Sequence, residues 1–166
     1  TVSYQTHVQN VGWQNDVSNG DSSGTTGQSL RLEGIKIQLT DLPYAGSISY
    51  STHIQNIGWQ NDVSDGLLSG TTGLELRLEA IKIKLNGEMA NNFDIYYRVH
   101  AQNFGWMGWA KNGEPAGTAE YSYRSEAIQI KIIPKGSEAP GNTTGAFVVN
   151  PKVVLNVPFV SQLTPT

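Results

Sequence analysis

Residues 1–16 read TVSYQTHVQNVGWQND, and nearly the same line returns as SISYSTHIQNIGWQND at residues 47–62 and as DIYYRVHAQNFGWMGW at residues 94–109. A second line follows each across a glycine-rich link: SLRLEGIKIQL at 29–39, ELRLEAIKIKL at 75–85 and SYRSEAIQIKI at 122–132. The spacing is 46 positions from His7 to His53 and 47 from His53 to His100. Such a period is typical of repeat and pseudosymmetric folds, in which one unit cannot bury its apolar face alone.

Both lines alternate with the period of a β-strand. In the first copy the two faces are Val2, Tyr4, Thr6 and Val8 against Ser3, Gln5, His7 and Gln9. This alternation predicts half-buried strands. In the second line the alternation changes parity at Glu33-Gly34, Glu79-Ala80 and Glu126-Ala127, which indicates a bulge, a tight bend or a strand that passes from one sheet to another.

The repeats predict an all-β fold without any helix of ordinary length. Each copy offers three or four short strands, and a lone β unit of roughly 40 residues without disulfides or metal is rarely stable. We therefore expect three pseudo-threefold repeats to close into a single β-prism-like, or alternatively β-trefoil-like, domain that protects its sheet edges. The SGTTG segments at 23–27 and 69–73 are expected to be wide turns, and the third copy departs there with AGTAE at 116–120.

The chain divides by composition into repeats and a tail. The repeats occupy residues 1–133, as about 1–41, 47–87 and 94–133. Residues 134–150 are rich in Pro, Gly, Ser and Thr and are expected to be a linker. Residues 151–166 are expected to be a strand-like tail or the start of a truncated following domain.

Composition excludes several function classes. Charged residues make up 15% of the chain, the net charge is -3, and Lys and Arg are scattered singly, so no nucleic-acid partner is expected. Cysteine is absent, which removes disulfides, thiolate nucleophiles and Cys-ligated metals. No apolar run is long enough to span a bilayer, so no membrane insertion is expected. The chain opens inside a strand pattern without a signal peptide, as expected for an excised or processed fragment.

The repeated tryptophans are the first candidates for ligand binding. An exposed indole stacks on the apolar face of a sugar, and nearby amides and carboxylates can bind hydroxyl groups. The alternative is that each indole fills the same packing gap in each unit. The candidate ligand-binding residues are Trp13, Trp59, Trp106, Trp109, His7, His53, His100, Gln9, Gln55, Gln102, Asp16 and Asp62.

The histidines and the charged pairs have structural as well as chemical interpretations. Three imidazoles could converge on an axis and bind a metal. Their polar neighbours on the same strand face favour instead a histidine that is hydrogen-bonded within its own repeat. No metal site or cofactor is therefore predicted. Arg31 and Glu33, with their equivalents, lie two apart and are expected to form ion pairs. No nucleophile elbow or Ser-His-Asp set is present, so the fragment is not expected to be an enzyme.

The strings HVQNVGWQNDVSNG and SGTTGQSLRLEGIKIQL resemble the clostridial hydrophobic repeat with conserved tryptophan, the ChW repeat, in all three copies. This resemblance implies non-catalytic binding modules of secreted or cell-surface bacterial proteins, mainly Gram-positive. The family often has a second tryptophan three residues after the first, which only Trp109 provides here. The segment VVLNVPFVSQLTPT at 153–166 is similar to the entry of papain-like peptidases of the bacteriocin-processing type.

Together these features predict a multivalent, lectin-like module that binds cell-wall or other extracellular polysaccharide. The alternative is a protein-interaction or scaffold module that recognises a surface protein through Leu67, Leu68, Met107 or Trp109. A further alternative is the targeting region of a peptidase or cell-wall hydrolase. A glycan ligand should find up to three equivalent sites, whereas a protein partner would favour one face.

Overall fold

The computed structural model describes residues 1–151 and consists almost entirely of β-strands. Repeat 1 contains β1 (Val2–Val8), β2 (Gly12–Trp13), β3 (Val17–Ser18), β4 (Ser22–Gly24) and β5 (Leu32–Leu39). Repeat 2 contains β6 (Gly46–Ile54), β7 (Gly58–Trp59), β8 (Val63–Ser64), β9 (Ser69–Gly70) and β10 (Leu78–Gly87). Repeat 3 contains β11 (Phe93–Ala101), β12 (Gly105–Trp106), β13 (Ala110–Lys111), β14 (Pro115–Ala119) and β15 (Ser125–Pro134).

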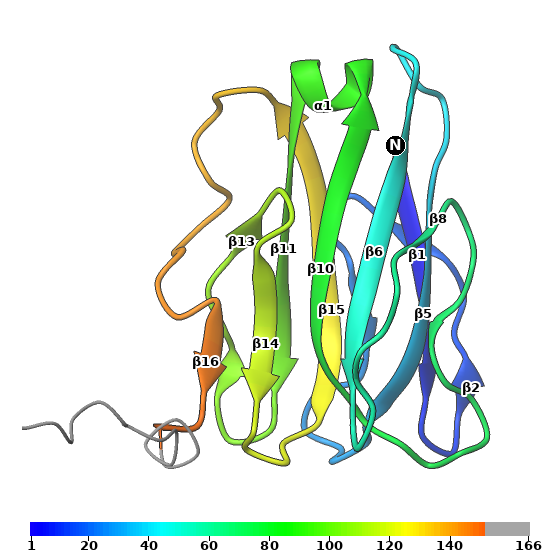
Figure 1. Cartoon of the computed structure of the whole chain (residues 1–166), viewed down its shortest axis with the longest axis vertical. Helices are drawn as coiled ribbons and strands as arrows, with labels where there is room; N and C mark the ends of the chain where they lie inside the picture. The colour runs from blue at the N-terminus through cyan, green and yellow to red at the C-terminus, as the bar shows by residue number, and fades with distance from the viewer. Residues whose placement is uncertain (152–166) are drawn as a thin grey trace, which may run out of the picture.

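Two further elements lie outside this pattern. The helix α1 (Glu88–Asn92) is a single turn in the link between repeats 2 and 3, and its Met89 is buried. The strand β16 (Phe147–Val149) pairs in parallel with β14 (Figure 1). The stretch expected to be a linker, 134–150, thus contains a strand that packs on repeat 3. No helix within residues 1–151 is long and apolar enough to cross a membrane.

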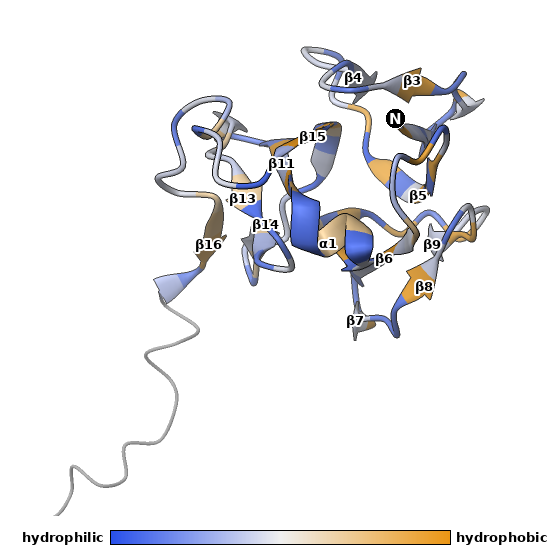
Figure 2. Cartoon of the chain, turned by 90° about the horizontal axis from the view of Figure 1, so that it is seen from above, coloured by the Kyte–Doolittle hydropathy of each residue, from blue (hydrophilic) through white to orange (hydrophobic). Residues whose placement is uncertain are grey.

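Each repeat forms a sheet and receives one strand from a neighbour. In repeat 1 the long strands β1 and β5 pair antiparallel, and β9 of repeat 2 adds to β5. In the same way β14 of repeat 3 adds to β10, and β4 of repeat 1 adds to β15. The first repeat is therefore joined to the third as well as to the second. Seen from above, the three sheets lie around a common interior (Figure 2).

The core is a single apolar cluster fed by all three sheets. The strand faces predicted from alternation are the buried ones, since Val2, Tyr4, Thr6 and Val8 are each fully buried. Their equivalents on β6 and β11 enter the same cluster. The all-β class and the three-repeat organisation are confirmed, while assignment to a β-prism or a β-trefoil remains a prediction.

The exchanged strands correct the interpretation of the SGTTG segments. These segments were expected to be wide turns. Instead, the Ser-Gly residues at the start of each segment belong to β4 and β9, which pair with the sheet of a neighbouring repeat. Only the residues that follow them form a bend. The third copy keeps this function because AGTAE lies within β14 up to Ala119. A Gly-rich segment by itself predicts a turn. Its pairing as a strand could not be predicted locally, because the partner strand lies in another repeat.

Candidate functional site

Each repeat has a β-bulge in its last long strand, and the extra residue is a glutamate. His7 faces Gly34 and Val8 faces Leu32, so Glu33 has no partner on β1. The same shift leaves Glu79 unpaired opposite β6 and Glu126 unpaired opposite β11. A bulge redirects the extra side chain out of the regular alternation. The change of parity seen in the sequence is therefore a bulge.

The redirected carboxylate joins a histidine and an arginine. His7 Nδ1 lies 2.8 Å from Glu33 Oε1, and Arg31 Nε donates to Glu33 Oε2 at 2.9 Å. The equivalent distances are 2.9 and 2.8 Å around Glu79, and 2.9 and 2.9 Å around Glu126. Glu33 is only 5% exposed, so its charge needs this compensation. The predicted ion pairs are confirmed, each within one repeat.

The histidine also contacts the indole that recurs in each repeat. His7 and Trp13 face each other across β1 and β2, with ring centroids 5.3 Å apart at 82°. The same edge contact recurs between His53 and Trp59 at 5.4 Å and between His100 and Trp106 at 5.2 Å. Each histidine is thus bound within its own repeat, as predicted. Residues 1–151 contain no cluster of three His, Cys, Asp or Glu placed to hold a metal ion.

A cation lies over each indole. Lys36 Nζ is 4.5 Å from the Trp13 ring centroid, and Lys82 Nζ is 4.2 Å from that of Trp59. In repeat 3 the Arg98 guanidinium lies 4.7 Å from Trp106. The indole is thereby held from its edge by histidine and from one face by a cation. We call this set of histidine, glutamate, arginine, indole and covering cation the repeat cluster.

The three indoles are half-buried, not sealed in the core. The turn before each is built by Asn and Gly with positive φ, as at Asn10 (φ 64) and Gly12 (φ 87). Asn and Gly tolerate that conformation best, which explains the recurring Q-N-x-G-W string. A shallow hollow of about 490 Å³ lies beside Trp59 and is lined by Gln60, Asn61, Val63, Leu68 and Gly70. Trp106 borders another of about 360 Å³, part of whose wall is residues 142–148.

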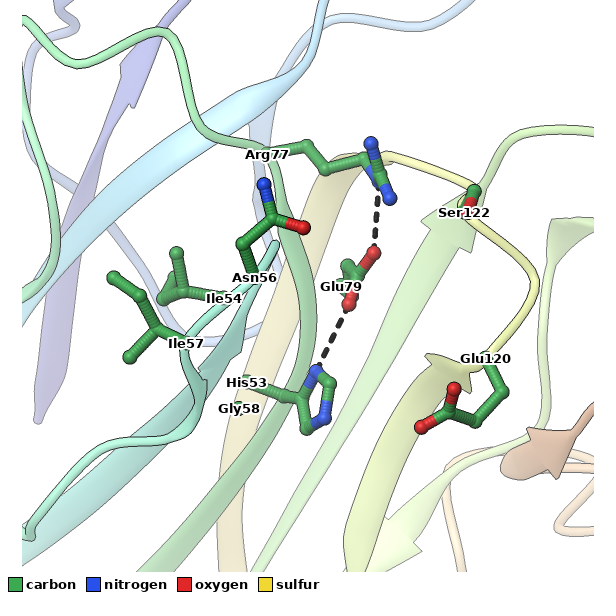
Figure 3. A pocket seen from close by; sticks show the side chains of 9 residues that line it. All are labelled: His53, Ile54, Asn56, Ile57, Gly58, Arg77, Glu79, Glu120 and Ser122. Atoms are coloured by element: carbon green, nitrogen blue, oxygen red, sulfur yellow. Dashed lines mark hydrogen bonds and ion pairs between the residues drawn. The ribbon is translucent and has the colours of Figure 1, made fainter.

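A second kind of cavity opens where two repeats meet (Figure 3). It measures about 330 Å³ and contains the histidine, glutamate and arginine of repeat 2. Figure 3 shows Arg77 and His53 approaching the Glu79 carboxylate from opposite sides, with Glu120 and Ser122 of repeat 3 on the facing wall. The full lining is His53, Ile54, Asn56, Ile57, Gly58, Arg77, Glu79, Glu120 and Ser122.

The predicted glutamines lie elsewhere than beside the indoles. The Oε1 atom of Gln9 accepts the backbone N–H of Arg31 at 3.1 Å, and Gln55 and Gln102 bind Arg77 and Arg124 in the same way. All three line a cavity of about 440 Å³ shared by the three repeats, together with Ser29, Arg31, Glu75, Arg77, Ser122 and Arg124. Each of these hydrogen bonds stays within one repeat, and none of the three glutamines lines an indole hollow.

The remaining candidates are divided between surface and interior. Asp16 and Asp62 are exposed, and Asp62 lines a hollow with Lys82 instead of one with the indole. Trp109 is 7% exposed, its backbone N–H donates to the Asn142 carbonyl, and the Arg98 guanidinium lies over its ring as well as over that of Trp106. We therefore leave Trp109 out of the accessible site.

Sequence reasoning missed the exposed apolar residue of each Q-N-x-G-W turn. Val11, Ile57 and Phe104 are equivalent and are 55%, 52% and 41% exposed. The available signal was an apolar residue that recurs inside a turn, where burial is not required. Phe104 further contacts Tyr121 and Tyr123, which stack on each other with centroids 5.1 Å apart.

Comparison with known proteins identifies the repeats. The family model described as "Clostridial hydrophobic W" matches the chain three times, at residues 7–41, 53–87 and 100–134. These matches contain every residue of the three repeat clusters except Arg98, which lies just before the third match. No curated protein and no solved structure matches the chain. The segment that resembles a peptidase entry lies outside the described residues.

Proposed function

Because the chain belongs to the clostridial hydrophobic W (ChW) family and carries the same half-exposed cluster three times, we propose that it is a multivalent, non-catalytic module that binds cell-wall or other extracellular polysaccharide. Its parent would be an exported bacterial protein, secreted or held at the surface of a Gram-positive cell. The observation that carries this proposal is the hollow beside Trp59, which is lined by an indole, two amides and two aliphatic side chains.

The chemistry of that hollow suits a sugar ring. An indole offers a flat apolar surface to the C–H face of a sugar, and planar amides bind its hydroxyl groups. The side-chain oxygen Oε1 of Gln60 already accepts the backbone N–H of Gly70 at 2.7 Å, which fixes the side-chain amide in one orientation. His53 and Lys82 hold the indole in place, so binding does not have to order it.

Three weak sites on one rigid body favour a repeating polymer over a single sugar. When one site is engaged, the others meet the same polymer at a high effective concentration, which raises the overall affinity by about 10²- to 10⁴-fold. The exchanged strands hold the clusters at fixed positions around the molecule. A non-catalytic role is supported by the glutamates, since both carboxylate oxygens of each are engaged by His and Arg.

Retention on insoluble peptidoglycan, chitin and cellulose tests the proposal. We expect the wild-type protein to be retained on at least one polymer, and Trp59→Leu to lower the retained fraction because it removes the indole face. The double change at Trp13 and Trp59 should lower it further. Far-ultraviolet circular dichroism must show that each variant is folded.

Tyr44→Ala is the matched control, since it removes a 42% exposed aromatic that belongs to no repeat cluster. It should leave retention unchanged. Equal retention of wild type and the folded double tryptophan variant would refute the role of the indoles.

A protein partner is the alternative, supported by Leu67 and Leu68, which are 59% and 38% exposed and occur only in repeat 2. Met107 and Trp109, which were also expected to contact a protein partner, are buried. Titration calorimetry distinguishes the two: a glycan oligomer should occupy up to three sites, whereas a protein should bind one to one and lose affinity with Leu67→Ala.

A further inference from the structure

The cavity between repeats 2 and 3 contains a carboxylate that the other copies lack. Equivalent positions of the three repeats are occupied by Gly27, Gly73 and Glu120. All three have left-handed backbone, with φ of 74, 75 and 64 respectively. Glycine adopts this conformation freely, whereas a residue with a Cβ is disfavoured there. The third repeat thus keeps a glutamate where its two siblings keep the residue that fits the backbone best.

The Glu120 carboxylate forms no ion pair or hydrogen bond with other residues of the described chain. Its residue is exposed, and only its backbone carbonyl is engaged, by the Asn150 side chain at 3.1 Å. No ion pair or side-chain hydrogen bond to this carboxylate exists within residues 1–151. Figure 3 shows it on the wall of the cavity opposite His53.

The charges of the cavity leave Glu120 uncompensated. Arg77 and Glu79 form an ion pair at 2.8 Å, so Glu120 is the carboxylate of the cavity lining that has no ion-pair partner within residues 1–151. The rest of the lining includes the amide of Asn56, the hydroxyl of Ser122 and the exposed side chain of Ile57. The cavity therefore combines one cation-binding group, two neutral hydrogen-bonding groups and an apolar surface.

We propose that this junction binds a sugar unit whose amine is unsubstituted, with the ammonium group donating to Glu120. Asn56 and Ser122 would bind hydroxyl groups of the same unit, and Ile57 would contact its apolar face. This inference rests on the proposed polysaccharide-binding function and deepens it, because it makes one of the three junctions selective for an amino sugar. An N-acetylated unit lacks the charge and gains no such contact.

The other two junctions do not offer the same group. Where repeat 3 meets repeat 1, the corresponding residues are Gly27 and Ser29, neither of which is charged. Where repeat 1 meets repeat 2, Gly73 replaces Glu120, and the nearby Glu75 lines the shared cavity with Arg31, Arg77 and Arg124. A ligand ammonium that approached Glu75 would also meet those guanidinium groups, so it is expected to prefer Glu120.

The test compares soluble glucosamine oligosaccharides with N-acetylglucosamine oligosaccharides of equal length by titration calorimetry. At about pH 6 and low salt, where the sugar amine is protonated, the wild type should bind the glucosamine form about threefold more tightly, the effect of a solvent-exposed ion pair. Glu120→Gln keeps the shape and should reduce the ratio to about one. The wild-type preference should also shrink in high salt, because exposed charges are screened.

Two further variants separate selectivity from folding. Glu75→Gln removes an exposed carboxylate with similar backbone (φ 58) and the same change of net charge, and should keep the wild-type ratio. Glu120→Gly restores the residue of the sibling repeats, so its thermal midpoint should equal or exceed that of wild type while the preference is lost.

Glycan binding without preference for the amine, or a preference that survives in Glu120→Gln, overturns this inference alone. Failure of the wild type to bind any glycan overturns the proposed function and this inference with it.

Discussion

At the scale of single residues, the cation over the indole is kept although its source changes. Lys36 faces Gln5 across two strands, and Lys82 faces Ser51 in the same way. In repeat 3 the pair is Arg98 and Gln129, so the cation comes from the opposite strand of the same pair. The side-chain oxygen Oε1 of Gln129 accepts a hydrogen bond from Arg98 Nε at 2.7 Å. In repeat 3 the cation and its cross-strand partner have exchanged strands, yet the contact between cation and indole is kept. This indicates that the indole requires the cation.

This reversal can be tested by restoring the order of the other repeats. Arg98→Gln should lower the free energy of unfolding by about 1 kcal/mol, because a cation–π contact is lost. Adding Gln129→Lys should recover about half of that loss, since the lysine reaches Trp106 but not Trp109. Urea unfolding of the two variants measures the difference. No recovery in the double variant would mean that Arg98 acts through its hydrogen bond to Gln129.

Three buried tyrosines connect neighbouring repeats. The Tyr4 hydroxyl donates to the Asp21 carbonyl and accepts the Ile130 N–H at 3.1 Å, and Tyr50 accepts the Ile37 N–H at the same distance. Tyr97 donates to the Glu114 carbonyl within its own repeat and also hydrogen-bonds with the backbone of Ile83 in repeat 2. Burial raises the pKa of Tyr4 to about 12 and also raises the pKa values of Tyr50 and Tyr97.

These shifts predict instability in alkali. An unfolded tyrosine ionises near pH 10, whereas Tyr4 in the fold keeps its proton to about pH 12. The stabilisation is therefore complete below pH 10 and is lost as the pH rises toward 12. Denaturant unfolding from neutral to alkaline pH should show this decline, and Tyr4→Phe should make it shallower. Tyr44→Phe, at an exposed position, should leave the slope unchanged; an unchanged slope in Tyr4→Phe as well would contradict the argument.

At the scale of elements, the exchanged strands depend on close contact with the bulges. A Cβ placed on Gly70 would lie 2.5 Å from the Glu33 carbonyl oxygen, and one on Gly117 would lie 2.4 Å from that of Glu79. Gly70 also has φ of 100, which disfavours any side chain. The bulge that presents each glutamate is thus the same feature on which the neighbouring strand rests, so the site and the junction are built together.

Gly70→Ala should therefore be strongly destabilising, by about 3 kcal/mol or more, because both the backbone conformation and the contact with repeat 1 are disturbed. Gly73→Ala is the control, since it shares a positive φ of 75 but would meet nothing within 4 Å. It should cost about 1 kcal/mol. Thermal unfolding of both variants gives the comparison, and equal losses would show that the strand contact contributes nothing beyond backbone strain.

At the scale of the whole molecule, the three repeats depend on one another in a ring of strand pairings. Repeat 2 supplies β9 to repeat 1, repeat 3 supplies β14 to repeat 2, and repeat 1 supplies β4 to repeat 3. The tyrosine contacts follow the same ring. A chain with only two repeats would leave one long strand without its partner and would open the common core.

We expect the fragment 1–92 to lack cooperative unfolding when isolated, and the fragment 93–151 to restore β-structure when added to it. Circular dichroism during denaturation of each fragment and of their mixture measures this. A fully cooperative transition of 1–92 alone, at the midpoint of the whole chain, would show that the repeats fold independently.

The local parts of this account could be predicted from the sequence. Alternation predicted the faces of the long strands, and the two-residue spacing predicted the Arg31–Glu33 pair. The parity change located an irregularity at Glu33, and the structure shows which of the three alternatives it is, a bulge. The position of Gln9 could not be predicted in this way, because its amide binds the backbone of Arg31, 22 residues away. The burial of Trp109 was equally hidden, since residues 141–142 cover it from beyond the repeat.

By itself, the sequence determined that the protein is built from three like β units, each with a histidine, a glutamate, an arginine and an indole in fixed order. Periodicity and spacing act within a few residues, and strand faces, bulges and turns respond to them directly. Only the tertiary structure decided which repeat lends a strand to which sheet and that Glu120 meets the cluster of His53. Those contacts depend on how separate sheets pack. A local sequence pattern does not specify which residues of different sheets come together.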